Sequence, residues 1–183
     1  MSSIIITGAN GGLGTAVTNR LVEDGYQVLA VTGESGPGPL AKIKNLASFQ
    51  VDLMNQDKAE SFVNKAIMTT DPNAAVLLVG GFAMGRLADT RKEDLEKMIG
   101  LNFYSAFNIV KPLMKHFLSR PEGGRFILAG SRPGLDASAG KDFFAYSLSK
   151  AMVFKLAEFI NAEGKDKRAL GCGIVPSACD QDV

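Results

Sequence analysis

Tyr146 and Lys150, four residues apart, are the side chains in this sequence with the clearest potential for proton transfer. Residues four apart on a helix share a face, so the phenol and the ammonium would lie close together. A free phenol has a pKa of about 10 and is a poor acid–base catalyst near neutral pH, whereas a nearby ammonium favours its ionised form. The pair could therefore move a proton. Equally, Tyr146 could be a core-edge residue and Lys150 a solvated one, because Y-x-x-x-K often occurs by chance.

A glycine-dense turn near the start of the chain could bind an anion. The spacing is T-G-x-x-x-G-x-G, formed by Thr7, Gly8, Gly12 and Gly14, and not G-x-G-x-x-G. Residues 4–6 predict a buried strand before the turn, and the apolar spacing from Leu13 onwards predicts a helix after it. Because glycines have no side chain, the backbone of the turn could approach a phosphate closely, and the helix N-terminus would offer it unpaired N–H groups. The alternative is a strand–helix connection that needs glycine only to turn.

The elements that must position these residues alternate between strand and helix along the whole chain. This alternation predicts an α/β fold of Rossmann type, a doubly wound parallel sheet in three layers, as a single domain over residues 1–183. Strands are expected at residues 4–6, 27–32, 49–52, 74–79, 125–129 and 170–175. Helices are expected from residue 13 to a C-cap at Gly25, at 56–68, at 90–117 and at 145–162, the last closed by Gly164.

The helix expected at residues 90–117 carries several boundary signals. Thr90 and Glu93 form a capping-box signature at its start, Gly100 interrupts it, and Pro112 is expected to bend or break it. Residues 33–39, rich in glycine and proline, are expected to be a loop.

Ligands of open parallel sheets bind beyond the carboxyl ends of the strands. The turns expected there are residues 8–14, 32–33, 52–53, 80–85, 130–134 and 176–177. These turns would line one crevice, and Ser131 would lie in it, directly after the fifth strand.

Taken together, these features resemble the short-chain dehydrogenase/reductase family over essentially the whole chain. Tyr146 and Lys150 match its Y-x-x-x-K motif, Ser131 its catalytic serine and Asn102 the asparagine of its long helix. The resemblance implies an NAD(P)-dependent oxidoreductase that interconverts a carbonyl and an alcohol, or reduces a conjugated imine-like ring. Tyr146 would be the general acid, Ser131 would hydrogen-bond the carbonyl oxygen, and Asn102 would hold a water that relays protons through Lys150. Without the resemblance, Asn102 would be a helix residue facing a polar contact.

The resemblance also implies which residues bind the dinucleotide. They are Gly8, Asn10, Gly11, Gly12, Leu13, Gly14, Thr32, Asp52, Leu53, Gly80, Gly81, Tyr146, Lys150 and Pro176. Asp52 and Leu53 match the pair that contacts the adenine, although Asp52 could simply be a strand-end carboxylate. Thr32 stands where an acidic residue would select NAD, which slightly favours NADP over NAD, and Lys42 or Lys44 could reach the 2′-phosphate.

The sequence departs from the family pattern after the fourth strand, where V-G-G-F at residues 79–82 replaces N-N-A-G. This turn is similar to that of the dihydropteridine-reductase-like branch, which is not known for a serine at the position of Ser131. Phe143 and Phe144, with Phe82 and Met84, could form an apolar wall for a substrate ring, or could be core residues.

Composition excludes several other classes of function. The 183 residues carry a net charge of +1 without a block of like charges, which gives no reason to expect nucleic acid or an anionic membrane as a partner. The apolar runs are too short to span a bilayer, and no signal-peptide pattern precedes residues 4–6, which favours a cytoplasmic protein. Cys172 and Cys179 are interpreted as ordinary thiols. His116, the only histidine, has no partners for a zinc site, and it lies too far along its helix to join Ser131 in a hydrolase triad.

The chain ends soon after Pro176, so the C-terminal helix and seventh strand usual in the family are expected to be lacking. We interpret the sequence as incomplete; the alternative is that a partner subunit covers the exposed strand edge. By resemblance to the family, a homodimer or homotetramer would form through the two long helices, which carry Phe103, Phe107, Met152 and Phe159. The alternative function is a non-catalytic dinucleotide-binding sensor or assembly subunit.

Overall fold

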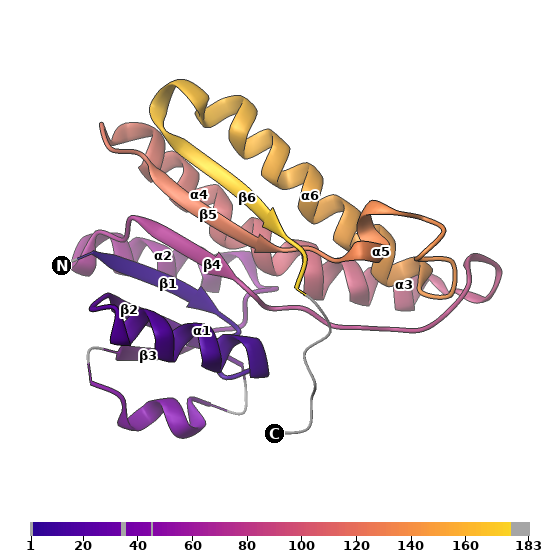
Figure 1. Cartoon of the computed structure of the whole chain (residues 1–183), viewed down its shortest axis with the longest axis horizontal. Helices are drawn as coiled ribbons and strands as arrows, with labels where there is room; N and C mark the ends of the chain where they lie inside the picture. Colours follow the sequence, from indigo (N-terminus) through magenta and orange to yellow (C-terminus); the bar gives the residue numbers. More distant parts are fainter. Residues whose placement is uncertain (1, 34–35, 45, 177–183) are drawn as a thin grey trace.

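The computed structural model describes residues 2–33, 36–44 and 46–176, with the backbone alone for Pro39 and Lys42. These residues form one parallel sheet of six strands in the order β3-β2-β1-β4-β5-β6 (Figure 1). The strands are β1 Ser3–Thr7, β2 Gln27–Thr32, β3 Leu46–Gln50, β4 Ala74–Leu77, β5 Gly124–Ala129 and β6 Ala169–Ile174. The strand order reverses between β1 and β4, which is where such sheets bind their ligands. The predicted doubly wound Rossmann fold is confirmed.

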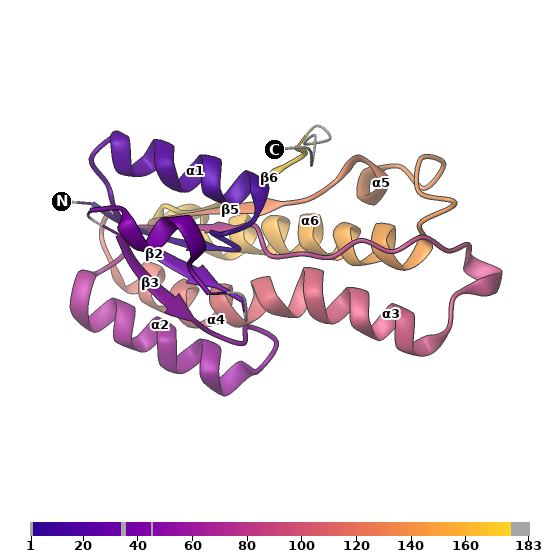
Figure 2. The same cartoon turned by 90° about the horizontal axis from the view of Figure 1, so that it is seen from below.

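Helices cover both faces of this sheet, which gives the three predicted layers. They are α1 Gly12–Glu23, α2 Gln56–Thr70, α3 Lys92–Ile99, α4 Ser105–Ser119, α5 Arg132–Leu135 and α6 Phe144–Gly164. Short 3-10 helices lie at η1 Gly38–Lys42, η2 Leu87–Asp89 and η4 Lys165–Lys167, and a π-helical turn, η3 Gly100–Tyr104, joins α3 to α4. Figure 2 shows α1 on one face of the sheet and α2, α4 and α6 on the other.

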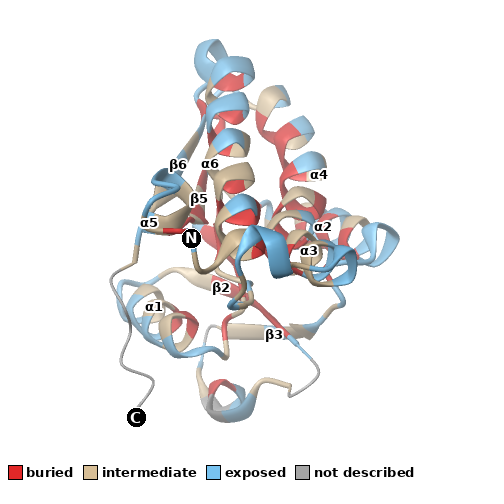
Figure 3. Ribbon diagram, turned by 90° about the vertical axis from the view of Figure 1, so that its right-hand side faces the viewer, coloured by how far each residue is buried: buried red, intermediate tan, exposed pale blue. Residues whose placement is uncertain are grey.

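The two faces have separate apolar cores because successive side chains of a strand point to opposite sides. Ile5 packs with Phe117 and Phe126 on the side of α2, α4 and α6. Ile4 and Ile6 pack on the side of α1. Figure 3 shows buried stretches recurring along α4 and α6, as expected of helices that turn one side to the sheet. Burial on both faces explains why β1 reads as a continuous isoleucine run.

Some predicted boundaries were wrong. The third strand spans Leu46–Gln50 instead of residues 49–52, so Asp52 lies beyond its end, and the fourth strand stops at Leu77. The 3-10 helix Gly38–Lys42 begins inside the predicted loop. The chain remains helical through Gly164, so the cap falls on Lys165 and not on the glycine.

The signals along the predicted helix of residues 90–117 also need correction. The capping box is not formed, because Arg91 is the N-cap residue of α3 and the Thr90 hydroxyl donates to the backbone oxygen of Arg86, at 2.8 Å. Gly100 does interrupt the regular helix, but by starting the π-helical turn. Pro112 lies inside α4, which continues to Ser119, so the helix is not broken there.

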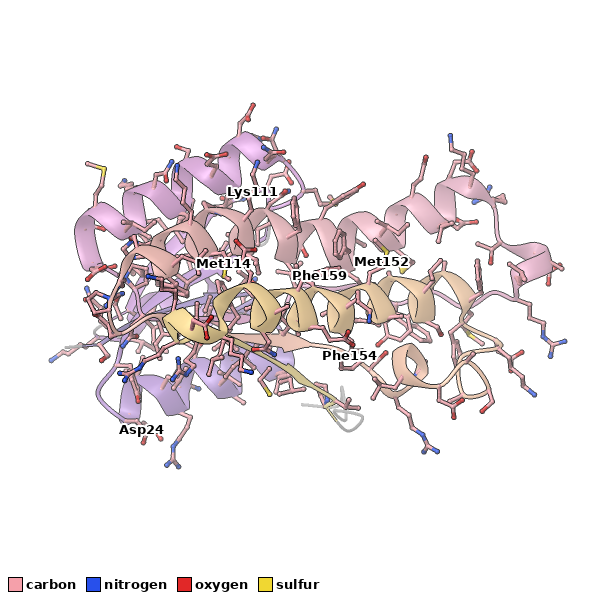
Figure 4. The ribbon with its side chains drawn as sticks, turned by 90° about the horizontal axis from the view of Figure 1, so that it is seen from above. Asp24, Lys111, Met114, Met152, Phe154 and Phe159 are labelled. Carbon is pink, nitrogen blue, oxygen red and sulfur yellow. The ribbon has the colours of Figure 1, made fainter. Side chains whose placement is uncertain are left out.

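Glycines bring α6, the helix that carries Tyr146 and Lys150, unusually close to the sheet. A Cβ atom on Gly130 or Gly173 would lie 2.1 or 2.7 Å from the ring of Phe154, which points from α6 towards β6 (Figure 4). At the edge strand β6, the side-chain amide of Asn161 accepts from Gly171 N at 2.9 Å and donates to Gly171 O at 2.8 Å. These contacts hold α6 against β6 and the end of β5.

Candidate active site

The glycine turn after β1 has the backbone geometry of an anion cradle. Gly8 has φ of +66°, which favours glycine, and a Cβ atom on Gly14 would lie 2.0 Å from Gly8 O. Gly11 is the N-cap residue of α1, and no described side chain caps this N-terminus. A Cβ atom on Gly12 would meet no described atom within 4 Å, so the space before the helix is open. These features fit the pyrophosphate of a dinucleotide.

The predicted neighbours of the glycine turn are placed around it. Asn10 donates from Nδ2 to Gly36 O at 2.9 Å, which links the turn to the loop after β2. Leu13 is half-buried in the first turn of α1. The Thr32 hydroxyl is buried and donates to Phe49 O at 3.4 Å, so it is used within the sheet.

A groove of about 1140 Å³ opens at the ends of β2 and β3. The predicted cofactor residues Thr32, Asp52 and Leu53 line it, together with residues of α2. Asp52 Oδ1 accepts from Met54 N at 3.1 Å, and Leu53 O accepts from Asn108 Nδ2 at 2.9 Å. Asn108, which the sequence analysis missed, therefore fixes the loop expected to contact the adenine.

Lys150 is buried at the carboxyl end of the sheet, with 6% of its surface exposed. Its Nζ donates to Ala129 O at 2.7 Å, directly before the Ser131 turn. A Cβ atom on Gly80 would lie 3.2 Å from this Nζ, so the loop after β4 passes immediately beside it. Burial lowers the pKa of Lys150 from 10.5 to about 8. The alternative of a solvated lysine is thereby excluded.

Asn102 lies in the π-helical turn and is 1% exposed. Its Oδ1 accepts from Gly81 N at 2.9 Å, and its Nδ2 donates to Gly81 O at 3.1 Å and to the Ser149 hydroxyl at 2.9 Å. Ser149 in turn donates to Tyr146 O at 2.7 Å. The Asn102 amide thus joins the loop after β4 to the Tyr146–Lys150 turn, and both its N–H groups are used within the protein.

Ser149 is a site residue that the sequence analysis missed. Its position three residues after Tyr146 is a signal, because a helical serine can hydrogen-bond the carbonyl of the preceding turn. Its second partner, Asn102, is 47 residues away in the chain, so the sequence pattern does not reveal the pair.

Tyr146 is half-buried near the start of α6, and Lys150 Nζ lies 6.0 Å from the centre of its ring. Ser131 is the N-cap residue of α5, and its hydroxyl accepts from Gly134 N at 3.4 Å. A Cβ atom on Gly134 would lie 2.8 Å from Lys150 Cβ, so α5 packs directly on the Tyr146–Lys150 turn. Pro176 follows β6 at the same edge of the sheet.

Of the four aromatic and apolar residues expected to form a wall, two contact each other beside Tyr146. The Phe82 ring lies 5.2 Å from the Phe143 ring and 5.1 Å from the Tyr146 ring, measured between centroids. Met84 is largely exposed, and Phe144 begins α6 with its N–H donated to Gly85 O. Phe82 and Met84 are therefore surface residues and not core residues.

The other chemical candidates lie elsewhere. His116 Nε2 is 2.8 Å from Asp71 Oδ1, just before β4 begins, whereas Ser131 follows the end of β5. The two residues therefore lie at opposite ends of the parallel strands, which excludes a triad that contains both. The described residues contain no group of three or more His, Cys, Asp or Glu side chains suited to a metal ion. Cys172 is exposed and unpaired, and Cys179 lies outside the described residues. Among the helices described, none has the length and apolar character needed to cross a membrane.

The chain belongs to the short-chain dehydrogenase family, whose profile matches residues 2–183. 3beta-Hydroxysteroid dehydrogenase 2 of Eggerthella lenta is 28% identical over 164 residues, which are 84% of this chain and 62% of that protein. A short-chain dehydrogenase structure from Streptomyces avermitilis has a TM-score of 0.91 at 19% identity, over 100% of this chain and 69% of that one. 4-Hydroxyisoleucine dehydrogenase, solved with NADH, has a TM-score of 0.86 at 21% identity, over 97% of this chain and 74% of that one.

The chain is therefore similar to dehydrogenases, and one of its structural neighbours was solved with NADH. The chain spans 62% of the length of the Eggerthella lenta relative. The branch similar to dihydropteridine reductase, suggested by V-G-G-F at residues 79–82, stays a prediction.

Proposed function

We propose that this protein is an NAD(P)-dependent oxidoreductase that interconverts a carbonyl group and an alcohol, with Tyr146 as the general acid and base. The observation that carries the proposal is the burial of Lys150 beside Gly80 and the Tyr146 turn. A buried ammonium costs free energy, and proteins retain such groups at functional sites. A non-catalytic sensor would not need a proton-transfer group there.

The residues divide into those that hold the dinucleotide and those that handle the proton. The glycine turn would hold the pyrophosphate and the groove at Asp52 and Leu53 the adenosine, which supports a bound dinucleotide. When bound, NAD(P)H supplies the hydride that reduces the carbonyl carbon. Tyr146 would donate its hydroxyl proton to the carbonyl oxygen.

Two further residues would support that proton transfer. Ser131 would donate a hydrogen bond to the same carbonyl oxygen, which stabilises the charge that develops there. Lys150, with a pKa of about 8, can carry a proton at neutral pH and return one towards Tyr146 through a water. Asn102 would position Gly81 and the Tyr146 turn, and its side chain is committed to that task.

The test compares the wild type with Tyr146→Phe, which removes only the hydroxyl group. Cofactor binding is measured by NADPH and NADH fluorescence, and turnover by cofactor oxidation with a panel of ketones and aldehydes. We expect unchanged cofactor affinity and a loss of turnover of about 100-fold or more. Full activity of the variant would contradict the role of Tyr146. Cofactor binding without turnover by either protein would support the sensor function instead.

We further propose a preference for NADP over NAD, because no carboxylate ends β2 to repel a 2′-phosphate. Lys44 is exposed on the segment after β2 and could reach that phosphate. The Lys44→Ala variant should then lose affinity for NADPH and keep its affinity for NADH. Equal affinities of the wild type for both cofactors would contradict the preference.

We also propose that two copies of the chain associate through α4 and α6. A groove of about 650 Å³ runs between these helices, and Figure 4 shows Lys111 and Met114 on one side of it and Met152 and Phe159 on the other. Phe159 is 66% exposed, and burying such a side chain against a second copy would stabilise a dimer. Light scattering at micromolar concentration should give a dimer mass for the wild type and a monomer mass for Phe159→Asp. A monomeric wild type would contradict this proposal.

A further inference from the structure

Phe82 is a large apolar side chain that the fold holds at the surface beside Tyr146. It is 60% exposed, although aromatic side chains usually bury most of their surface. Its ring lies edge-on to the Tyr146 ring, with 5.1 Å between centroids and an interplanar angle of 69°. On another side it contacts Phe143, at 5.2 Å and 50°. Part of the ring therefore packs against the start of α6, and the rest is open.

The loop that carries Phe82 is fixed on both sides of this residue. Before it, Gly81 is held through both its N–H and C=O groups by Asn102. After it, Gly85 N donates to Asp142 O and Gly85 O accepts from Phe144 N, each at 2.8 Å, which forms a parallel β-bridge. Figure 1 shows the loop after β4 running alongside the segment before α6 in this region.

An ion pair strengthens this attachment, because Arg86 Nε lies 2.7 Å from Asp142 Oδ1. Phe82 is thus exposed without being on a free loop. An exposed aromatic ring held in one place binds a ligand at little further entropic cost.

We propose that Phe82 is a stacking surface for a planar ring of the substrate, so that the enzyme prefers aryl ketones and aryl aldehydes. This inference rests on the function proposed above. Aromatic pairs in offset-stacked or edge-to-face contact are stabilised beyond the burial of their area, an addition that a saturated group of the same size lacks. Because the Phe82 and Tyr146 rings are in contact, a substrate ring stacked on Phe82 would lie next to the Tyr146 side chain, within reach of its proton. The carbonyl then becomes a secondary or primary alcohol, with the hydride from NAD(P)H and the proton from Tyr146.

Two further apolar side chains that follow Phe82 in the chain are exposed. Met84 and Leu87 are 75% and 69% exposed, and Met84 lies two residues from Phe82. Thioether sulfur makes favourable contacts with aromatic rings.

The test uses two ketones matched in size, acetophenone and cyclohexyl methyl ketone. The ratio of their kcat/KM values is compared between the wild type and Phe82→Leu, so that their intrinsic difference in reactivity cancels. We expect the leucine variant to lower the preference for acetophenone by about 3- to 10-fold, mainly through KM, while Phe82→Trp retains it. Tyr104→Leu, which removes another exposed aromatic ring outside the proposed site, is the matched control and should leave the ratio unchanged.

The possible failures are distinguishable. If Tyr146→Phe abolishes turnover and Phe82→Leu leaves the ratio unchanged, the stacking surface is refuted and the proposed function stands. If Phe82→Leu weakens NADPH binding as much as it raises KM, Phe82 serves the cofactor, which also refutes the inference. Saturation-transfer NMR with acetophenone in the presence of NADP⁺ does not depend on turnover. With the wild type, we expect saturation to pass from the protein to the ring protons of acetophenone, and with Phe82→Leu we expect that transfer to be lost. Absence of the transfer with the wild type overturns the proposal.

Discussion

Replacing Lys150 by methionine should make the protein more stable at neutral pH, although it removes a residue proposed to support proton transfer by Tyr146. Lys150 is buried, and burial lowers its pKa from 10.5 to about 8. At pH 7 the ammonium is charged in both the folded and the unfolded chain, so this lowering corresponds to a destabilisation of about 3 kcal/mol. The variant leaves Ala129 O without its donor, which costs about 1–2 kcal/mol. The net expectation is a gain of about 1–2 kcal/mol.

The pH dependence of this gain has a definite sign. The folded pKa lies below the unfolded one, so the unfolded chain binds more protons between about pH 8 and pH 10.5. The contribution of Lys150 to stability therefore rises with pH across that window. Between pH 7 and pH 9.5 the cost of the ammonium falls by about 2 kcal/mol, so the advantage of Lys150→Met should vanish or reverse.

Urea denaturation of the two proteins at pH 7 and pH 9.5 measures both effects. Lys155→Met, on the exposed side of the same helix, is the matched control for exchanging a lysine for a methionine. A lower stability of Lys150→Met at pH 7 would refute the argument from burial. So would a difference between wild type and variant that does not change with pH.

Two further predictions concern glycines that touch other atoms. Gly14→Ala should destabilise the protein by about 3 kcal/mol or more in thermal denaturation, because the new Cβ would lie 2.0 Å from Gly8 O. In Gly12→Ala the new Cβ points into open space, so this control should change stability by less than about 1 kcal/mol. Equal effects of the two variants would contradict the geometry of the turn. Gly130→Ala should cost about 2 kcal/mol through its clash with Phe154, and the double variant with Phe154→Val should recover part of that loss. A strictly additive double variant would show that the two residues do not contact each other.

The fold was largely predictable because its inner strands are buried on both faces. Residues 27–32 form β2 as predicted. A short run of apolar side chains, flanked by a glycine turn and a glycine loop, is typical of a strand buried on both faces. The third strand was misplaced because it lies at the edge of the sheet, where side chains alternate between half-buried and exposed. Its pattern therefore carries a weaker signal than those of the central strands.

The site was predictable where one segment supplies the signal, and not where distant segments meet. The spacing of Tyr146 and Lys150 is local, but the burial of Lys150 depends on Gly80 and Ala129, which come from two other strand ends. The link between Asn102 and Ser149 depends on the π-helical turn, which places the asparagine side chain between the loop after β4 and α6. π-Turns of this kind often mark functional sites, yet nothing in the local sequence announces one beyond Gly100.

The central claim is that this chain transfers a hydride to a carbonyl carbon while Tyr146 supplies the proton. The most direct measurement is mass spectrometry of the alcohol that the wild-type protein forms from acetophenone and deuterated NADPH. Two reactions are compared, in which the deuterium at C4 of the nicotinamide lies on one face of the ring or on the other. We expect one deuterium at the carbinol carbon from one of the two faces, and at least about 100-fold less alcohol with Tyr146→Phe. An alcohol without deuterium from either face, or equal labelled product from Tyr146→Phe, would contradict the account.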